Sequence, residues 1–292
     1  MKYSICMTNY NTEDVIERSL DSIISKINPD EFEIVVVDSN SKDRSLEILE
    51  RYAENYGNMK IISKKCLRGR GWQTAFEHST GDTIILAACD TIYNDLWIKL
   101  IQTYEHEGFD FALSAWFTQI YPRKLLEEVG GWKNLQYWED VELWGRLAKI
   151  KKYKTYPIVC GENLKRTVHT NIFEKTYRRY RRVHDKMLIA KHIPTYLWVL
   201  TYWKIYREKH GLVGTIRRFG YQVAILFAAK IISRFRRLFF EYGDMRYLSN
   251  LEETVIDLGL GDIDDMQVEK GEYDTKENCI EAYKKGDYGY IP

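Results

Sequence analysis

Two apolar runs, each followed by an aspartate, restrict the possible folds of this chain more than any other feature. The first covers residues 32–37 and ends at Asp38, and the second covers Thr83–Ala88 and is followed by Asp90. Such continuous runs are typical of strands that are covered on both faces. In open α/β sheets, ligands bind in the crevice beyond the carboxyl ends of these strands. Asp38 and Asp90 are therefore the first candidates for a functional role.

Segments with helical periodicity lie between the expected strands, so the chain alternates strand and helix. Residues 3–7 form the first expected strand, and Thr12 suits the N-cap of the helix that follows. The polar loop between them consists of Thr8, Asn9, Tyr10 and Asn11. Further strands are expected at residues 59–63 and 109–115, with edge strands at 156–160 and 164–169. Further helices are expected around residues 46–53, 72–78 and 122–129, and from Tyr137 onward.

Two of these segments carry charged groups that are candidates for a site. Residues 68–71, with the sequence Arg-Gly-Arg-Gly, read as a flexible basic loop. The helix expected from Tyr137 has Glu139 and Asp140 in its first turn, where the helix dipole favours acidic groups. Its inward face is expected to carry Val141, Leu143, Trp144, Leu147 and Ile150.

Length and charge distribution divide the chain into three expected parts. A length of 292 residues accommodates one large α/β core, which we place at residues 1–171, and an appended segment. Residues 172–240 carry 16 basic and 3 acidic side chains, whereas the tail at residues 241–292 carries 5 basic and 14 acidic ones. The middle part is expected to bind an anionic partner, and its run YQVAILFAAKII suits a helix lying on a membrane surface.

The cysteines and the first residues indicate a cellular location. The five cysteines include no C-x-x-C pair, which argues against a disulfide framework and a zinc knuckle and favours a reducing compartment. No signal peptide precedes the first expected strand. A cytoplasmic protein is therefore expected, peripheral on the inner face of the cell membrane.

Five stretches, in this order, resemble the inverting family 2 glycosyltransferases of the GT-A fold: TNYNTEDVIERSLDSI, EIVVVDSNSKDRSLEIL, RGRGWQTAFEHSTGDTIIL, ACDTIY and GGWKNLQYWEDVELWGRLAK. The resemblance covers about residues 1–170. It implies a Rossmann-like mixed α/β sheet flanked by helices, as in nucleotide-diphospho-sugar transferases, with the basic helical segment as a C-terminal extension. It also implies transfer of a sugar from a nucleotide-diphosphate donor to an acceptor hydroxyl, with inversion.

The resemblance implies a donor site at the first strand ends. The loop of Thr8, Asn9, Tyr10 and Asn11 and the carboxylate of Asp38 would hold the base and ribose of a UDP- or GDP-sugar, with Asp38 accepting from a ring N–H. Arg68 and Arg70 would reach the diphosphate. The alternatives are a capped turn for Asp38 and a solvated basic loop for the two arginines.

The resemblance also implies a divalent cation, Mg²⁺ or Mn²⁺. Asp90 corresponds to the last acid of the family's D-x-D motif, which binds the ion between the donor phosphates. The chain departs from the pattern because Ala88 replaces the first acid, which leaves a single metal carboxylate. His169 falls where some relatives place a further ligand, and a structural histidine is the alternative.

Asp140 matches the acid of the family's E-D motif and is implied to be the general base that takes the proton from the acceptor hydroxyl. Glu139 could substitute for it, and ordinary acids at a helix N-terminus are the alternative for both. Three tryptophans could form a stacking wall for a sugar: Trp116, Trp132 and Trp138. The alternative is that these large aromatic side chains belong to the core.

The resulting hypothesis is a glycosyltransferase that acts on a sugar, glycolipid or polyprenyl-phosphate acceptor at the membrane face. One alternative is a transferase with a soluble or protein acceptor, and another is a nucleotide-sugar binding module without turnover. A nucleic-acid partner is not expected, because the arginine-rich segment contains no recognisable recognition module.

Overall fold

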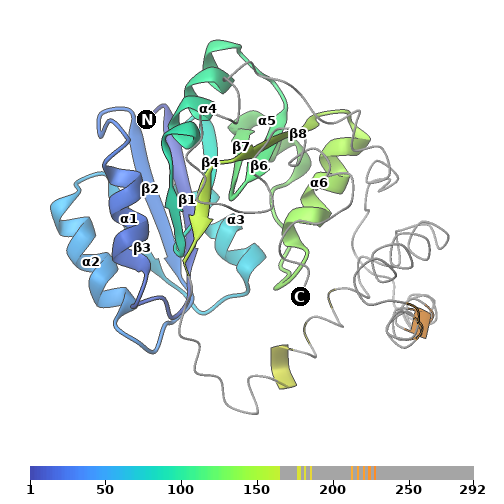
Figure 1. Cartoon of the computed structure of the whole chain (residues 1–292), viewed down its shortest axis with the longest axis horizontal. Coiled ribbons are helices and arrows are strands. Elements are labelled where there is room, and N and C mark those ends of the chain that lie inside the picture. The colour runs from blue at the N-terminus through green and yellow to red at the C-terminus, as the bar shows by residue number, and fades with distance from the viewer. Residues whose placement is uncertain are drawn as a thin grey trace.

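The computed structural model describes residues 1–164 and, beyond them, residues 176–178, 181, 185, 212, 216, 220, 223, 224 and 227. Strands and helices alternate along the first part, as Figure 1 shows. The strands are β1 (Tyr3–Asn9), β2 (Phe32–Asp38), β3 (Met59–Ser63), β4 (Thr83–Ala88), β5 (Thr91–Tyr93), β6 (Ala112–Trp116), β7 (Thr118–Pro122), β8 (Tyr153–Val159) and β9 (Gly161–Asn163). The helices are α1 (Ile16–Ile24), α2 (Ser45–Asn55), α3 (Arg68–His78), α4 (Asp95–His106), α5 (Arg123–Val129) and α6 (Glu139–Lys149).

Seven of these strands form one mixed sheet in the order β3-β2-β1-β4-β7-β6-β8. The first four are parallel, β7 runs antiparallel to both of its neighbours, and β8 is parallel to β6. β5 and β9 form a separate antiparallel pair. Because β1, β2 and β4 are parallel neighbours, their carboxyl ends meet at one edge, as the polar residues after each run predicted.

The sheet separates two apolar layers. In β1, Ile5 and Met7 belong to the layer that α1, α2 and α4 cover, whereas Cys6 belongs to the layer that α3, α5 and α6 cover. Figure 1 shows α1 and α2 side by side against the parallel strands. Both faces of the strands are therefore buried, which explains why their sequences are continuously apolar.

The expected N-cap at Thr12 is wrong. Helix α1 begins at Ile16, and Val15 occupies the capping position without a side-chain hydrogen bond. The carbonyl oxygen of Thr12 accepts from Val15 N and Ile16 N, while its hydroxyl donates to Asn9 Oδ1. The hydroxyl therefore serves the end of β1 and not the helix.

The expected flexible loop at residues 68–71 is also wrong, because Arg68 already begins α3. A Cβ atom on Gly69 would lie 2.0 Å from the carbonyl oxygen of Lys133, and one on Gly71 would lie 2.8 Å from Thr8 Cγ2. These glycines therefore permit close packing of a helix and do not confer flexibility.

The sequence predicted the second half of the sheet less well. The strand expected at residues 109–115 covers only Ala112–Trp116, because Phe109 and Phe111 stack with each other at 4.7 Å and pack against Tyr104 of α4. Ile150, expected to face inward, is 40% exposed. Four elements were not predicted at all: β5, α4, β7 and β9. The strand expected at residues 164–169 lies outside the described residues apart from Leu164, which is not in a strand.

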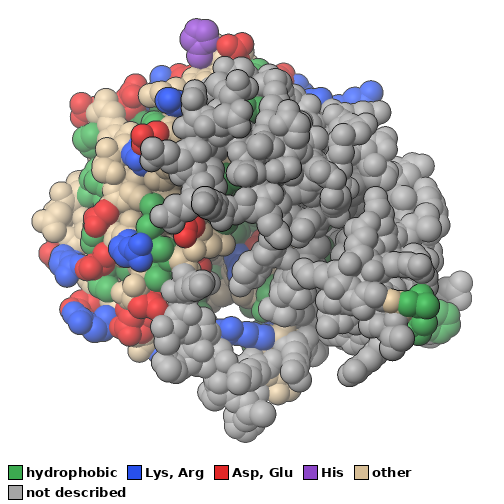
Figure 2. All heavy atoms as spheres, in the orientation of Figure 1, with side chains coloured by type: hydrophobic (Ala, Val, Ile, Leu, Met, Phe, Trp, Pro, Cys, Tyr) green, Lys and Arg blue, Asp and Glu red, His purple; other side chains and the backbone are tan. Residues whose placement is uncertain are grey.

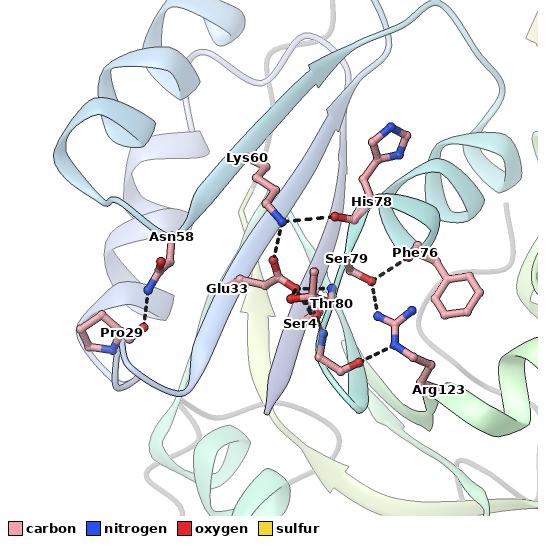
Figure 3. Close-up of polar contacts among 11 residues, drawn as sticks. Ser4, Pro29, Glu33, Asn58, Lys60, Phe76, His78, Ser79, Thr80 and Arg123 are labelled. Atoms are coloured by element: carbon pink, nitrogen blue, oxygen red, sulfur yellow. Dashed lines mark hydrogen bonds and ion pairs between the residues drawn. The ribbon is translucent and has the colours of Figure 1, made fainter. Parts of the chain in front are cut away.

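A buried carboxylate organises the amino ends of the strands, where Figure 3 shows Glu33 of β2 surrounded by donors. Its side chain accepts hydrogen bonds from the following groups: Ser4 Oγ, Lys60 Nζ, Thr80 N, Thr80 Oγ1 and Gly81 N. Burial raises the pKa of Glu33, but these hydrogen bonds outweigh burial and lower the pKa to about 2. This cluster joins β1 and β2 to the segment that leads into β4.

Candidate active site

The carboxyl ends of β1 and β2 lie side by side, with Asn9 directly opposite Asp38. Asp38 is fully buried, and its Oδ1 accepts from Asn9 Nδ2 at 2.7 Å and from Ser41 Oγ at 2.5 Å. Its Oδ2 accepts from Ser41 N at 2.9 Å. This arrangement is the capped turn that the sequence left open as an alternative, and in this conformation no surface of Asp38 is open to a ligand. Its contact with a nucleotide base stays a prediction.

The loops after β1 and β2 interlock through two asparagines with left-handed backbones, Asn11 at φ 51° and Asn40 at φ 61°. Asn11 N donates to Ser41 Oγ at 3.0 Å, and Lys42 N donates to Asn11 Oδ1 at 2.8 Å. Within the predicted donor loop, Asn9 is buried, Thr8 is half-buried against α3, and Tyr10 is 41% exposed. Tyr10 is therefore the side chain of this loop that a ligand reaches first.

Asp90 lies in the turn between β4 and β5, beside the end of β1, and its side chain is half-buried. The turn is held on both sides. The backbone N–H of Ala88 donates to Tyr93 Oη at 2.8 Å, and the carbonyl oxygen of Ala88 accepts from Ser19 Oγ at 2.9 Å. The carbonyl oxygen of Asp90 itself accepts from Leu164 N at 2.7 Å. These contacts fix the backbone of the turn that carries Asp90 at the strand end.

Arg68, the first residue of α3, lies where acidic side chains from two distant segments meet. Its Nη1 is 3.5 Å from Glu139 Oε1, and Glu139 is the main cause of the raised pKa of Arg68. Burial opposes this effect, and smaller contributions that raise the pKa come from Asp140, Tyr137 and Asp90. Arg68 is thus in contact with Glu139, while Asp140 and Asp90 act on its charge only as weaker electrostatic neighbours.

Glu139 is a buried carboxyl group that is neutral at pH 7. Its side chain is 4% exposed, and its Oε2 accepts no hydrogen bond from the described part of the chain. Burial raises the pKa of Glu139, Arg68 lowers it and the neighbouring Asp140 raises it again, with a result of about 8. A carboxyl group with this pKa retains its proton at neutral pH.

Asp140 differs from its neighbour because it is half-buried and retains an accessible surface. Its Oδ1 accepts from Val141 N at 2.7 Å. Burial raises the pKa of Asp140, and the hydrogen bond from Val141 and the charge of Arg68 lower it in part. A carboxylate that combines accessibility with a raised pKa has the properties of a general base.

The residue before this pair, Trp138, has a left-handed backbone with φ 67°. This conformation is rare for a bulky side chain and costs about 1–3 kcal/mol, so it persists only where the surroundings impose it. The carbonyl oxygen of Trp138 accepts from Glu142 N at 2.9 Å and so begins the hydrogen bonding of α6. The strained backbone thus sets the direction in which Glu139 and Asp140 leave the loop.

The two arginines of the Arg-Gly-Arg-Gly segment point to different places. Arg70 forms two hydrogen bonds with Glu77, at 3.1 and 3.2 Å, about two turns farther along α3. Its guanidinium is therefore not part of the cluster around Arg68. Only Arg68 belongs to the cluster with Glu139, and the role of either arginine at the diphosphate stays a prediction.

Of the two predicted metal ligands, only Asp90 lies in the described part of the chain. Among residues that the structure describes, no three His, Cys, Asp or Glu side chains are grouped to hold a metal ion. Asp90 alone offers a half-buried carboxylate at the end of β4. Mg²⁺ is often bound by one or two carboxylates together with substrate phosphates, so Asp90 fits an ion that binds with its donor. His169 lies outside the described residues.

The predicted stacking wall does not include Trp132. This side chain is 3% exposed and packs edge-on against Phe76 and Tyr121, with ring centroids 6.2 and 5.4 Å away, so it belongs to the core. Trp116 and Trp138 are half-buried.

The sequence did not predict the contacts that three residues of this region make. Ser41 holds the carboxylate of Asp38, and an aspartate followed by a serine three residues later is a turn signal that indicates such a bond. Gln136 accepts from Arg68 N through its side chain at 3.2 Å, and Asp185 accepts from the backbone of Gln136. Neither of these two contacts has a local signal, because the partners are far apart in the chain.

Comparison with known proteins assigns the chain to a family. The glycosyl transferase family 2 model matches residues 4–163. The poly(ribitol-phosphate) beta-glucosyltransferase of Bacillus spizizenii is 43% identical over 65 residues, which are 22% of this chain and 10% of that protein. The poly(ribitol-phosphate) beta-N-acetylglucosaminyltransferase TarS of Staphylococcus aureus is 31% identical over 103 residues, which are 34% of this chain and 18% of TarS. The matched stretches thus span less than a fifth of either relative.

Solved structures show the same fold. Residues 1–349 of S. aureus TarS in complex with UDP-GlcNAc superpose with a TM-score of 0.54 at 20% identity, over 65% of this chain and 66% of that one. The mannosyltransferase PcManGT of Pyrobaculum calidifontis, in complex with GDP-Man and Mn²⁺, superposes with a TM-score of 0.52 at 18% identity, over 81% and 76%. These similarities confirm the expected GT-A-like mixed sheet flanked by helices.

The fold places the chain among the glycosyltransferases of the GT-A type. The family model covers more than half of the chain, and the chain belongs to glycosyl transferase family 2.

Proposed function

We propose that this chain transfers a sugar from a nucleotide-diphosphate donor to an acceptor hydroxyl, with inversion at the anomeric carbon. The observation that supports it most strongly is the contact of Arg68 with Glu139, where the neighbouring Asp140 and the distant Asp90 also contribute to the raised pKa of Arg68. One place in the fold therefore combines a cation for phosphates, a carboxylate for a metal ion and a base for the acceptor.

In this proposal Asp140 is the general base. An acceptor hydroxyl that attacks the anomeric carbon must lose its proton, and the base has to lie on the face opposite the departing diphosphate. Asp140 is accessible, whereas Glu139 is buried and neutral at pH 7 because its pKa is about 8. Glu139 is therefore a poor proton acceptor at neutral pH.

The neutral state of Glu139 has a second consequence in this proposal. A protonated Glu139 does not neutralise Arg68, so the guanidinium keeps its charge for the donor phosphates, which it can bind through paired hydrogen bonds. Asp90 would hold Mg²⁺ or Mn²⁺ together with those phosphates. When bound, such an ion supplies charge stabilisation for the departing diphosphate.

The donor is proposed to be a UDP- or GDP-sugar, because the structural neighbours hold UDP-GlcNAc and GDP-Man. The relatives named above act on poly(ribitol phosphate), so an acceptor hydroxyl on a phosphate-bearing or lipid-linked glycan is proposed here. The net charge of residues 172–240, which carry 16 basic and 3 acidic side chains, suits an anionic acceptor of this kind.

Docking on the anionic inner face of the membrane is part of the proposal. The described positions 212, 216, 220, 223, 224 and 227 are each helical, and on an ideal helix this spacing would place them on one face. The large apolar side chains among them are exposed: Leu212 53%, Ile216 57%, Val223 39% and Phe227 68%. Exposed apolar side chains among basic residues are typical of interfacial helices. No helix in the described part of the chain has the length and hydropathy needed to cross a bilayer.

A donor screen tests the catalytic proposal. Purified protein with Mn²⁺ is incubated with UDP-, GDP- and dTDP-sugars, and released nucleotide is measured. Asp140→Asn is expected to lower kcat by about 10²–10⁴-fold, as for loss of a general base, with donor binding by calorimetry retained. Asp110→Asn, which changes a carboxylate 76% exposed and paired with Lys152, is the matched control. Donor binding without any turnover would favour a binding module, and an unchanged rate in Asp140→Asn would remove Asp140 from the base role.

Vesicle binding tests the membrane proposal. Co-sedimentation with anionic vesicles is expected to exceed that with neutral vesicles, and Ile216→Asp with Phe227→Asp is expected to reduce it at least tenfold, because burying each such side chain is worth roughly 1.5–3 kcal/mol. Ile150→Asp, at a residue 40% exposed outside this face, is the control. Equal binding of the double variant and the control would favour a soluble acceptor.

A further inference from the structure

The loop between α5 and α6, residues 131–138, leads directly into Glu139 and Asp140. Two successive backbone N–H groups of this loop, those of Gln136 and Tyr137, donate to Asp185 Oδ2 at 2.8 and 3.2 Å. Asp185 is fully buried. A carboxylate from a distant part of the chain therefore satisfies two polar groups that no helix or strand of the loop satisfies.

The buried charge of Asp185 is compensated by an arginine one helical turn earlier. Arg181 Nη2 lies 2.9 Å from Asp185 Oδ1, and the Arg181 side chain is 13% exposed. An unpaired buried carboxylate would cost several kcal/mol, so the ion pair is what allows Asp185 to reach the loop in its charged form. One oxygen of the carboxylate binds the arginine while the other binds the loop.

The opposite side of the same loop is held by α3. Arg68 N donates to Gln136 Oε1 at 3.2 Å, and Gly69 N donates to the carbonyl oxygen of Leu135 at 2.8 Å. The loop is thus fixed between α3 and Asp185 immediately before Trp138, whose φ of 67° requires such support. Removing one side would let the loop relax and would move the carboxylates that follow.

We propose that Asp185, supported by Arg181, is a positioning residue for the general base, so that a segment beyond the family 2 match at residues 4–163 completes the active site. The inference rests on the proposed function for its catalytic consequence. Asp185 does not touch the reacting atoms in this account. It acts by holding Gln136 and Tyr137, and through them the start of α6.

The test compares Asp185→Ala, Asp185→Asn and the control Glu47→Gln, which changes an exposed carboxylate in an i,i+3 pair with Arg44. Asp185→Ala is expected to lower kcat about a hundredfold, since a shift of about 1 Å near the reacting groups has an effect of this size. The KM for the donor is expected to change less than kcat, because Arg68, the proposed phosphate ligand, contacts this loop through its backbone N–H and not through its guanidinium. Asp185→Asn keeps an acceptor oxygen and is expected to recover part of the rate.

Hydrogen exchange of the peptide around residues 132–140 gives a readout that does not need activity. Asp185→Ala is expected to lose protection of the Gln136 and Tyr137 amides, and Glu47→Gln is expected to leave it unchanged. Unchanged protection in Asp185→Ala, or lost protection with an unchanged kcat, would overturn the positioning role. If Asp185→Ala does not fold, Asp185→Asn carries the same two measurements. A wild-type chain without turnover would overturn the proposed function alone, because the exchange result still decides whether Asp185 holds the loop.

Discussion

Two glutamates with little exposed surface, Glu33 and Glu139, lie at opposite ends of the strands and differ in their hydrogen-bond donors and in their pKa values. The Glu33 side chain is 3% exposed and the Glu139 side chain 4% exposed. Hydrogen bonds from Ser4, Lys60 and Thr80 overcome the effect of burial on Glu33 and lower its pKa to about 2. Glu139 has one guanidinium at 3.5 Å, and its pKa is about 8. The same residue type, equally closed to solvent at its surface, is thus charged where several donors surround it and neutral where burial is deeper and donors are few.

This difference distinguishes a carboxylate that stabilises the fold from a carboxyl group at the candidate active site. The amino end of the sheet satisfies its carboxylate completely, as Figure 3 shows, and so joins three segments of the fold. The carboxyl end leaves its carboxyl group partly unsatisfied beside Arg68 and Asp140, which is how active sites shift pKa values. Elsewhere, acidic and basic side chains are interspersed over the face made by α1 and α2, as Figure 2 shows, with exposed pairs such as Arg44–Glu47.

The largest effect is expected from Glu33→Ala. The substitution leaves the donors of Ser4 and Thr80 without their acceptor, whereas Gly81 N keeps its bond to Ser4 Oγ, and the free energy of unfolding is expected to fall by about 3–5 kcal/mol. Lys60 is half-exposed, so its share is small. Urea unfolding at pH 7 measures the change. Glu139→Gln is the matched variant and is expected to be at least as stable as the wild type at pH 7, so an equal loss in both variants would contradict the comparison.

The next effect is the pH dependence that Glu139 confers. Its pKa in the folded state, about 8, lies above its ordinary value of 4.5, so its proton stabilises the fold fully below pH 4.5 and this contribution is lost as the pH rises through 8. Between pH 5 and 8 the wild type is therefore expected to lose about 1 kcal/mol per pH unit relative to Glu139→Gln. Denaturant midpoints of both proteins at pH 5, 6.5 and 8 measure this slope. Parallel pH profiles would show that Glu139 is ionised in the folded state.

Glu33 is expected to show the opposite sign. Its folded pKa, about 2, lies below its ordinary value of 4.5, so its contribution is present above pH 4.5 and is lost as the pH falls from there toward 2. Unfolding of wild type and Glu33→Gln at pH 6 and pH 3.5 tests this sign. The difference in stability between them is expected to shrink at the lower pH, and a constant difference would contradict it.

Two glycines extend the comparison to packing. A Cβ atom on Gly81 would lie 2.6 Å from Ser4 Oγ, and one on Gly69 would lie 2.0 Å from the carbonyl oxygen of Lys133. Both alanine variants are expected to lose about 1–3 kcal/mol of stability, but only Gly69→Ala is expected to lower turnover as well, because it displaces the loop before α6. Gly57→Ala, where nothing lies within 4 Å, is the control in unfolding and activity assays. Equal turnover of the Gly69 and Gly81 variants would contradict this separation.

The smallest effect is expected from Arg70→Gln. The pair with Glu77 is exposed on both sides, so its loss is expected to cost no more than about 0.5 kcal/mol and to leave turnover within about twofold. Arg68→Gln, two residues earlier in the same helix, is expected to raise the KM for the donor. Steady-state kinetics with the best donor from the screen separates the two, and similar effects of both variants would place Arg70 at the diphosphate after all.

The sequence predicted the parallel half of the sheet well. The strands β3 and β4 have the expected boundaries, and β1 and β2 extend the expected ones only at their carboxyl ends. Their residues are apolar throughout because both faces are buried, and that pattern is visible in a single sequence. The other half was predicted poorly. The turn between β6 and β7 has no glycine, and Phe117 adopts its left-handed φ of 69° there, so no turn signal marked β7.

The candidate site likewise has features that the sequence predicted and features that it did not. The residue types and their positions after the strands, such as Asp90 after β4 and the Glu139–Asp140 pair at the start of α6, follow from local patterns in the chain. Only the tertiary structure shows three further features. Arg68 and Arg70 point in different directions, and Ser41 hydrogen-bonds the buried carboxylate of Asp38. Asp185 contacts the loop before α6. The physical reason is that strand and helix patterns arise from burial of nearby residues. Pairings across many residues depend instead on strand order and on loop conformation, which local spacing does not encode.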